Sequence, residues 1–169
     1  VTNVMDYASN LPEASWKRWL LSLGVITGGR LNEISQLTTS DIQTFESGIV
    51  AIHINEAGEG KSIKNKRSER LVPLTDGAYG FDLAAFLRYV DSCKLSGSES
   101  LAQIGYKTAG DWANRQAIPV ALGDDHKPGL TYHSFRHSLA SLMQVKGVST
   151  VHAQALMGHA SGTITFDTY

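Results

Sequence analysis

The sequence predicts a mainly α-helical domain with one small antiparallel β-sheet inserted after its second helix, which is an α+β fold. Apolar residues recur at helical spacing near the start of the chain and again from Asp82 onward. Between these regions, β-branched residues form short runs around a glycine-containing turn. The chain has 169 residues, of which 42% are hydrophobic and 18% are charged, so it can bury the core of one domain.

Two helices are expected before the sheet. The first covers residues 12–23 and runs into Gly28 and Gly29, two adjacent glycines that should break it. The second is short and covers residues 30–37. A cap or turn is expected at residues 38–41, because threonine, serine and aspartate favour such positions.

The small sheet is expected within residues 48–74 and should have two or three strands. One strand covers residues 49–54, which are rich in β-branched side chains. A turn follows at residues 56–60, and a last strand covers residues 71–74. Pro73 should close that strand, since proline cannot donate a ladder hydrogen bond.

The rest of the chain is expected to be helical. The expected helices cover residues 82–93, 101–117, 131–147 and 149–158, with a polar loop at residues 123–129. Thr131 and Ser149 are the expected caps of the last two helices. Gly147 and Gly158 are their expected ends.

The composition of the chain limits the classes of protein to which it can belong. No apolar run approaches the roughly eighteen residues of a membrane span, and no signal peptide opens the sequence. Cys93 is the one cysteine, so an internal disulfide is excluded and a packing role is expected. The net charge of −1 is weak for a protein that binds nucleic acid, so such a function must depend on local basic clusters. We therefore expect a soluble intracellular protein.

The segment Thr131–His137 carries the first candidate site. On a helix, His133, Arg136 and His137 can share one face, which would offer a proton carrier and a fixed cation to an anionic substrate. The alternative is an ordinary solvated helix face. A metal site on the two histidines is disfavoured by the arginine between them.

The segment Thr27–Ile34 carries the second. Its glycines would let the backbone approach a ligand closely, and Arg30 follows at the start of a short helix. Glu33, one turn later, could orient that arginine or a neighbouring one. A helix break with a surface ion pair is the alternative, and the glycine spacing is not that of a nucleotide-binding loop.

A basic segment and two separate residues complete the set. Five basic residues lie close together with one acid, Glu69; they are Lys61, Lys64, Lys66, Arg67 and Arg70. On a hairpin they could contact phosphates, or they could protect an edge strand. His159 and Tyr169 are uninformative singly.

The order of these residues resembles the catalytic domain of the tyrosine recombinases, the phage integrase family. That family has Thr-Gly-x-Arg-x-x-Glu, a hairpin lysine before Arg-x-Val-Pro-Leu, His-x-x-Arg-His, Leu-Gly-His and a tyrosine, in this order. The corresponding residues here are Thr27–Glu33, Lys64 ahead of Arg70–Leu74, His133–His137, Met157–His159 and Tyr169. The resemblance covers essentially the whole chain. Met157 stands where the family usually has leucine, and residues 160–168 are one residue longer than the commonest spacing.

The resemblance implies the fold of DNA breaking and rejoining enzymes and a role for each residue. Tyr169 would attack a DNA phosphodiester and form a 3′-phosphotyrosyl link, without a metal ion, ATP or another cofactor. The other implied catalytic residues are Arg30 and Arg136 as the phosphate clamp, His133 and His159 as phosphate contacts, and Lys64 as the proton donor to the leaving 5′-oxygen. Glu33 and His137 would support the site. Lys61, Lys66 and Arg67 would contact DNA, and either Lys61 or Lys66 could replace Lys64 as the hairpin lysine.

The resemblance also implies partners and context. The partner would be double-stranded DNA, with a homotetramer formed on it by the full-length protein, in a bacterial or phage-encoded, nucleoid-associated and cytoplasmic setting. Because the chain begins at Val1, we expect residues 1–169 to be an excised catalytic domain without its N-terminal core-binding domain and post-tyrosine tail. Three alternatives are a non-catalytic DNA-binding relative, a type IB topoisomerase-like enzyme, and a metal hydrolase using His133, His137, His152 and His159.

Overall fold

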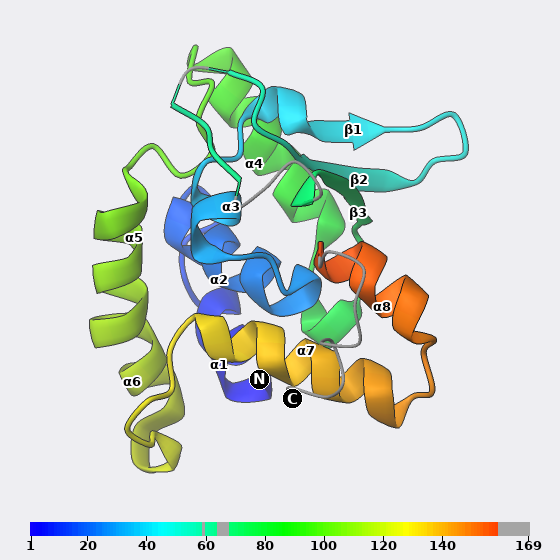
Figure 1. Cartoon of the computed structure of the whole chain (residues 1–169). Helices are drawn as coiled ribbons and strands as arrows, with labels where there is room; N and C mark the ends of the chain where they lie inside the picture. The colour runs from blue at the N-terminus through cyan, green and yellow to red at the C-terminus, as the bar shows by residue number, and fades with distance from the viewer. Residues whose placement is uncertain (59, 64–67, 159–169) are drawn as a thin grey trace.

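The computed structural model describes residues 1–58, 60–63 and 68–158 (Figure 1). Three helices precede the sheet, namely α1 (Thr2–Ser9), α2 (Trp16–Thr27) and α3 (Leu31–Ser35). The sheet has the order β1-β2-β3, and its strands are β1 (Ile42–Thr44), β2 (Val50–Ile54) and β3 (Arg70–Pro73). The helices after it are α4 (Leu83–Leu95), α5 (Tyr106–Trp112), α6 (Ile118–Leu122), α7 (His133–Val145) and α8 (Thr150–Met157). The prediction of a mainly helical domain with a small antiparallel sheet is confirmed.

Two elements lie outside the predicted ranges. Helix α1 was not expected, and it packs against α2 with Val4, Met5 and Ala8 buried. Strand β1 begins at Ile42, ahead of the region in which the sheet was expected. It pairs antiparallel with β2 over three residues, too short a run for alternation to reveal from sequence.

The helical stretch expected at residues 101–117 is displaced toward the C-terminus. Leu101 donates its amide to the carbonyl of Leu37, and Gln103 has a positive φ of 57°, so the chain is irregular before α5 begins. After α5, a π-helical turn at Ala113–Ala117 continues into α6. Pro119 is tolerated because it lies in the first turn of α6.

The caps of α7 and α8 differ in how well they were predicted. Thr131 does not cap α7; Tyr132 occupies that position without a side-chain cap. For α8 the prediction is confirmed, because Ser149 accepts a hydrogen bond from the amide of His152. Gly158 ends α8 in the left-handed conformation, with φ 61°.

The strand register turns one charged side chain inward. Ile52 lies opposite Val72 and Ile54 lies opposite Arg70, and all four of these side chains are buried. Arg70 therefore faces the same side of the sheet as Val72, because side chains two apart on a strand share a face. A buried cation at such a position requires partners that satisfy its charge.

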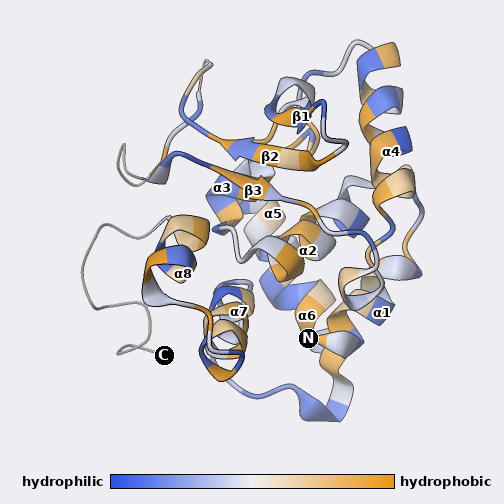
Figure 2. Cartoon of the chain, turned by 90° about the vertical axis from the view of Figure 1, so that its right-hand side faces the viewer, coloured by the Kyte–Doolittle hydropathy of each residue, from blue (hydrophilic) through white to orange (hydrophobic). Residues whose placement is uncertain are grey.

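Two hydrophobic clusters hold the described residues together. The large one is centred on α2 and α4, where Trp19 contacts the rings of Phe81, Phe86 and Tyr89. The small one lies between α7 and α8, and its buried members are Ala140, Met143, Ala153 and Met157. Figure 2 shows α8 below β3 and beside α7, at one end of the molecule.

Within the described ranges, no helix has the length and apolar character needed to cross a membrane.

Candidate active site

The turn after α2 is shaped by Thr27 and Gly28. The Thr27 hydroxyl donates to the carbonyl of Leu23 at 2.6 Å and accepts the amide of Gly29 at 3.1 Å. Gly28 ends the helix with φ 60°, a conformation that glycine adopts at little cost. This local geometry explains the Thr-Gly-Gly sequence and directs the chain into Arg30.

The space over Gly28 is filled by α7, which corrects the expectation that these glycines admit a ligand. A Cβ atom on Gly28 would lie 2.8 Å from Cδ2 of Leu139 and 3.7 Å from the Cα of Arg136. The small residue therefore lets α2 and α7 pack closely. It also leaves the Gly28 carbonyl open to Arg136, whose Nη1 donates to it at 3.0 Å.

Arg136 is the largest of the fully buried side chains among the described residues, with 1% of its surface exposed. Besides Gly28, its guanidinium donates through Nη2 to the carbonyl of Met157 at the end of α8. It thus joins the end of α2 to the end of α8. His133 and His137 lie on the same helix and are exposed, whereas Arg136 is buried, so the three residues do not share one open face as predicted.

Arg30 and Glu33 form the expected pair. Arg30 is the N-cap residue of α3, and its Nη1 donates to Oε1 of Glu33 at 2.6 Å. The Arg30 amide donates to Oε2 of the same carboxylate at 2.9 Å. Side-chain exposure is 22% for Arg30 and 2% for Glu33, so the guanidinium reaches the surface while the carboxylate is buried.

Glu33 also binds a second arginine, Arg70, which sequence reasoning had counted only as part of a basic segment. Nη2 of Arg70 donates to Oε2 of Glu33 at 2.9 Å. Burial raises the pKa of Glu33, but the hydrogen bond and charge of Arg70 and the contacts from Arg30 outweigh it and lower the pKa below its usual value. The carboxylate is therefore charged and holds both arginines.

Arg70 extends this cluster to α8. Its Nε donates to the carbonyl of Leu156 at 2.7 Å, and its Nη1 donates to the carbonyl of Ser68 at 2.8 Å. The signal that could have identified it is the strand alternation, because an arginine on the inward face beside Val72 must find buried acceptors.

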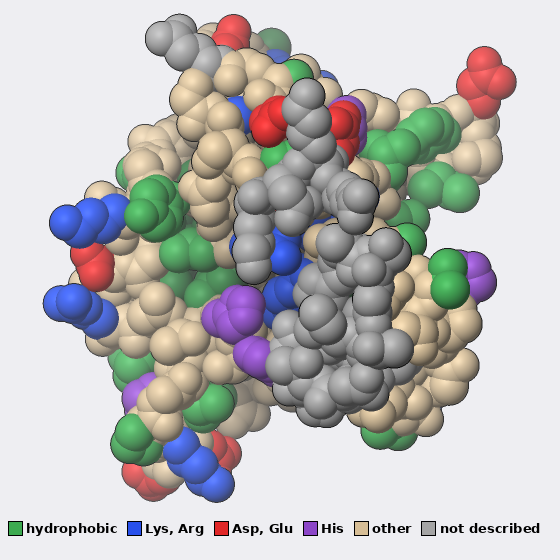
Figure 3. Space-filling model, viewed as in Figure 1, with side chains coloured by type: hydrophobic (Ala, Val, Ile, Leu, Met, Phe, Trp, Pro, Cys, Tyr) green, Lys and Arg blue, Asp and Glu red, His purple; other side chains and the backbone are tan. Residues whose placement is uncertain are grey.

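His133 and His137 lie together on the exposed side of α7. Their ring centroids are 4.9 Å apart in an edge-to-face arrangement. They line a shallow hollow of about 580 Å³ with Thr131 and the serines at positions 134, 138 and 141. Figure 3 shows histidine side chains beside a strip of Lys or Arg side chains near the middle of this face. Polar hydroxyl and imidazole groups of this kind suit a phosphate-bearing ligand.

Lys61 forms an ion pair with Asp41. Its Nζ lies 2.5 Å from Oδ2 of Asp41, and 8% of its side chain is exposed. Burial raises the pKa of Asp41, but the hydrogen bonds from Lys61, the Thr38 amide and Asn55 outweigh it and lower the pKa. These contacts favour a structural role for Lys61; its assignment to DNA contact stays a prediction.

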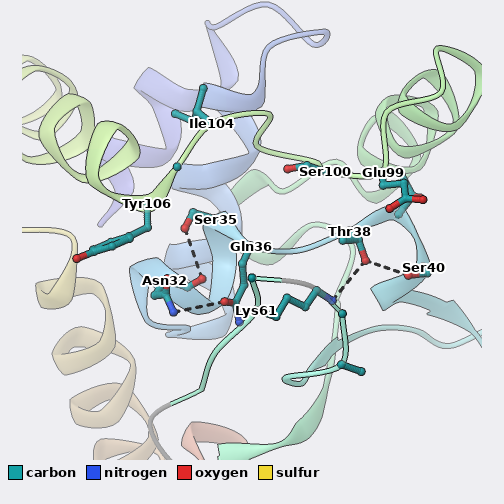
Figure 4. A pocket seen from close by; sticks show the side chains of 15 residues that line it. Asn32, Ser35, Gln36, Thr38, Ser40, Lys61, Glu99, Ser100, Ile104 and Tyr106 are labelled. Carbon is teal, nitrogen blue, oxygen red and sulfur yellow. Dashed lines mark hydrogen bonds between the residues drawn. The ribbon is translucent and has the colours of Figure 1, made fainter.

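A separate cavity lies next to the arginine cluster around Glu33 and shares Asn32 with it. It has a volume of about 670 Å³ between α3, the turn at Thr39–Asp41 and the start of α5. Figure 4 shows Lys61 reaching toward Thr38 along its wall, with Asn32 and Gln36 nearby. It contains none of the arginines or histidines that were predicted as catalytic.

The comparison with protein families shows to which family the chain belongs. The model of the phage integrase family matches residues 1–169, the whole of the chain. The chain belongs to the phage integrase family. The structure brings the segments around Gly28 and Glu33 close to the end of α8.

Relatives and solved structures agree with this. Tyrosine recombinase XerC of Chlamydia muridarum (strain MoPn / Nigg) is 29% identical over 147 residues, which cover 85% of this chain and 43% of the relative. XerC of Chlamydia trachomatis serovar L2 (strain ATCC VR-902B / DSM 19102 / 434/Bu) gives the same figures. The chain thus spans less than half the length of these curated relatives.

The fold is similar to that of XerH site-specific recombinase. In the crystal structure described as a pre-cleavage complex with difH substrate, the TM-score is 0.65 at 23% identity, covering 94% of this chain and 45% of that one. In the post-cleavage complex with palindromic difH substrate, the values are 0.63, 21%, 94% and 44%. The expectation of a tyrosine recombinase catalytic-domain fold is confirmed.

Five of the predicted site residues lie outside the described ranges. They are Lys64, Lys66, Arg67, His159 and Tyr169. Among the residues that the structure does describe, no group of three or more His, Cys, Asp or Glu side chains is placed to hold a metal ion. The described part of the candidate site therefore consists of Arg30, Glu33, Arg70, Arg136 and the two histidines of α7.

Proposed function

We propose that this chain is the catalytic domain of a site-specific DNA recombinase. It cuts and rejoins double-stranded DNA through a 3′-phosphotyrosyl intermediate at Tyr169. Membership of the phage integrase family supports the reaction class, and the similar proteins XerC and XerH carry recombinase names. Because the chain spans less than half of those relatives, the activity of the whole protein is part of the proposal.

One contact carries the proposal: the hydrogen bond from Arg136 to the carbonyl of Gly28, 108 positions away in the sequence. Gly28 lies two residues before Arg30, so this bond brings the arginines of two separate family motifs to one junction. Two permanently charged guanidinium groups at one place suit the negative charge that develops on the non-bridging oxygens of a phosphate.

In the proposed reaction, the Tyr169 oxygen attacks the phosphorus and the bond from phosphorus to the 5′-oxygen breaks. Lys64 donates a proton to the leaving 5′-oxygen, and His133 assists proton transfer at the tyrosine. The covalent ester keeps the energy of the phosphodiester, so rejoining requires neither ATP nor a metal ion. Return of the 5′-hydroxyl reverses the same steps and releases the tyrosine.

The remaining residues support this chemistry in the proposal. Glu33 orients Arg30 because its two carboxylate oxygens accept hydrogen bonds from the amide and the guanidinium of Arg30. His159 adds a phosphate contact, His137 is structural, and Lys66 and Arg67 contact the DNA backbone. We further propose that the full-length protein acts as a homotetramer on DNA in the cytoplasm.

A covalent trapping experiment tests the proposal. A pool of nicked duplexes with randomised arms is incubated with wild type and with Tyr169→Phe, and DNA that becomes linked to protein is recovered and sequenced. We expect wild type to form the adduct in the presence of a chelator, and Tyr169→Phe to form none. A Tyr169→Phe protein that still becomes labelled would exclude this tyrosine as the nucleophile.

The same experiment separates the alternatives. A non-catalytic DNA-binding relative would retain duplexes without a covalent link. A topoisomerase-like enzyme would form the adduct but would not exchange strands between two copies of the recovered duplex. A metal hydrolase would lose its activity when the chelator is added.

A further inference from the structure

The last carbonyls of α8 are held by arginines. A helix leaves its final carbonyl groups without partners inside the helix, and cations near that end are favourable. Here Arg70 donates through Nε to Leu156 at 2.7 Å, and Arg136 donates to the next carbonyl, that of Met157. The end of α8 is therefore bound to two side chains of the site.

Arg70 also lies directly against Gly158, the residue at which the chain leaves α8. A Cβ atom on Gly158 would lie 2.6 Å from Nη1 and 3.0 Å from Cζ of Arg70. The guanidinium thus contacts both the last turn of the helix and the glycine that follows it. His159 is the next residue, and Tyr169 comes ten positions after that.

The other side of the Arg70 guanidinium binds the carboxylate of Glu33 at 2.9 Å. That carboxylate in turn binds Arg30 at 2.6 Å. The side chains of Arg70 and Glu33 are 5% and 2% exposed, so water does not replace these contacts. An unbroken chain of buried and partly buried hydrogen bonds therefore runs from Arg30 through Glu33 and Arg70 to Leu156.

Apolar packing at this end of α8 has no aromatic side chain among its described members. The cluster between α7 and α8 buries two alanines and two methionines, with Leu139, Val148 and Leu156 packed against it, whereas the main core includes several large aromatic side chains. The direction in which the chain leaves α8 is therefore set to a large extent by polar contacts that also touch the predicted catalytic arginines.

We propose that Arg70 is a positioning residue of the strand-cleavage reaction: it fixes the end of α8, and with it the start of the segment that carries His159 and Tyr169, relative to Arg30. This rests on the proposed function. Arg70 acts through Glu33 and the Leu156 carbonyl and does not touch the DNA. The planar guanidinium reaches the carboxylate and the carbonyl from separate nitrogens, whereas the compact ammonium of a lysine would have to serve both from one atom.

The test is Arg70→Lys, which retains the charge opposite Glu33 and so is expected to fold. A duplex recovered from the randomised pool is used at saturating concentration, and the single-turnover rate of adduct formation is measured together with the dissociation constant of the DNA. We expect the rate to fall roughly 10- to 100-fold with little change in the dissociation constant, since a displaced nucleophile affects the chemical step.

Two control variants make the result specific. Arg88→Lys makes the same change at an exposed ion pair with Glu13, and it should cleave at the wild-type rate. Val72→Ala lies two residues along the same strand on the same buried face. At a temperature at which it is destabilised as much as Arg70→Lys, it should still cleave at close to the wild-type rate.

Each outcome decides the matter. If Arg70→Lys cleaves as fast as Arg88→Lys, or if Val72→Ala at matched stability is equally slow, Arg70 contributes only to folding and the proposal is overturned. A loss confined to DNA affinity overturns it too. If wild type forms no adduct at all, the proposed function fails, and this inference fails with it. If wild type and Arg70→Lys both form the adduct at the same rate, only this inference fails.

Discussion

The main core and the small cluster between α7 and α8 hold their helices in different ways. Around Trp19 the chain buries aromatic rings in mutual contact, and the stability of that region depends on apolar area. Helix α8 buries one small and one flexible side chain, Ala153 and Met157, against α7, and its end accepts hydrogen bonds from Arg70 and Arg136. Burial of apolar side chains thus holds the main core together. Helix α8, which precedes the predicted nucleophile, is held in addition by arginines of the candidate site.

This difference indicates that an arginine of the candidate site has two kinds of partner, backbone carbonyls in the protein and a phosphate in the proposed reaction. In the structure Arg136 donates to two backbone carbonyls, while the proposed reaction requires its guanidinium to stabilise a phosphate. A guanidinium has five N–H donors, so it can bind backbone and phosphate together. Changes at the site should therefore alter both catalysis and the attachment of α8, whereas changes in the main core should alter overall stability alone.

The largest effect is expected from Phe86→Ala, which opens a cavity in the main core. Phe86 is fully buried and contacts the rings of Trp19 and Phe81. We expect a loss of about 4 kcal/mol in the free energy of unfolding, measured by denaturant titration. A loss below about 1 kcal/mol would contradict the view that aromatic burial holds the scaffold.

Arg136→Lys should affect the site more than the scaffold. Removing one preorganised donor typically costs roughly 3 kcal/mol in the reaction barrier, so adduct formation should slow about 100-fold or more. The loss of the bond to Met157 should also raise amide hydrogen exchange in α8. Unchanged exchange there, with slowed cleavage, would separate the two roles that the structure gives this side chain.

Met157→Ala tests the small cluster. Met157 is fully buried at the end of α8, and shortening it should cost about 2 kcal/mol. We expect most of this lost stability to appear as easier local opening of α8, measured as faster hydrogen exchange at residues 150–157. The free energy of global unfolding should change less. If global stability falls by the whole amount, α8 unfolds with the main core and the comparison is wrong.

The smallest effect is expected from acid. The pKa of Glu33 is lowered in the folded chain, so its stabilising contribution is present above the ordinary value of 4.5 and is lost as the pH falls through the lowered value. Stability should therefore decrease on acidification below about pH 4.5. Glu33→Gln should show a shallower decrease in stability, measured as the unfolding midpoint against pH. Because the pKa of Asp41 is also lowered, Asp41→Asn measures how much of the decrease comes from that carboxylate.

Sequence periodicity was enough for the helices and strands that bury a regular face. Helix α4 and its cap at Asp82, strand β3, and the start and end of α8 follow local rules that a single sequence displays. Strand β1 and helix α1 were missed because they are stabilised by pairing or packing with segments that come later in the chain.

The site shows the same division. Arg30 and Glu33 lie one turn apart, so their pairing could be predicted from spacing. The contacts of Arg70 and Arg136 could not, because their partners, the Glu33 carboxylate and backbone carbonyls, lie up to 108 positions away and depend on how the helices pack. For the same reason the role of Gly28 was misjudged: its missing side chain accommodates α7.

The central claim is that Tyr169 forms the covalent link to DNA, and peptide mapping of the trapped adduct tests it most directly. Residues 147–169 contain no lysine or arginine, so trypsin leaves them in one peptide, and the one tyrosine among them is Tyr169. We predict that fragmentation by mass spectrometry will place a nucleotide, attached through its 3′-phosphate, on that tyrosine. A nucleotide attached to any other residue, or through a 5′-phosphate, would contradict the account.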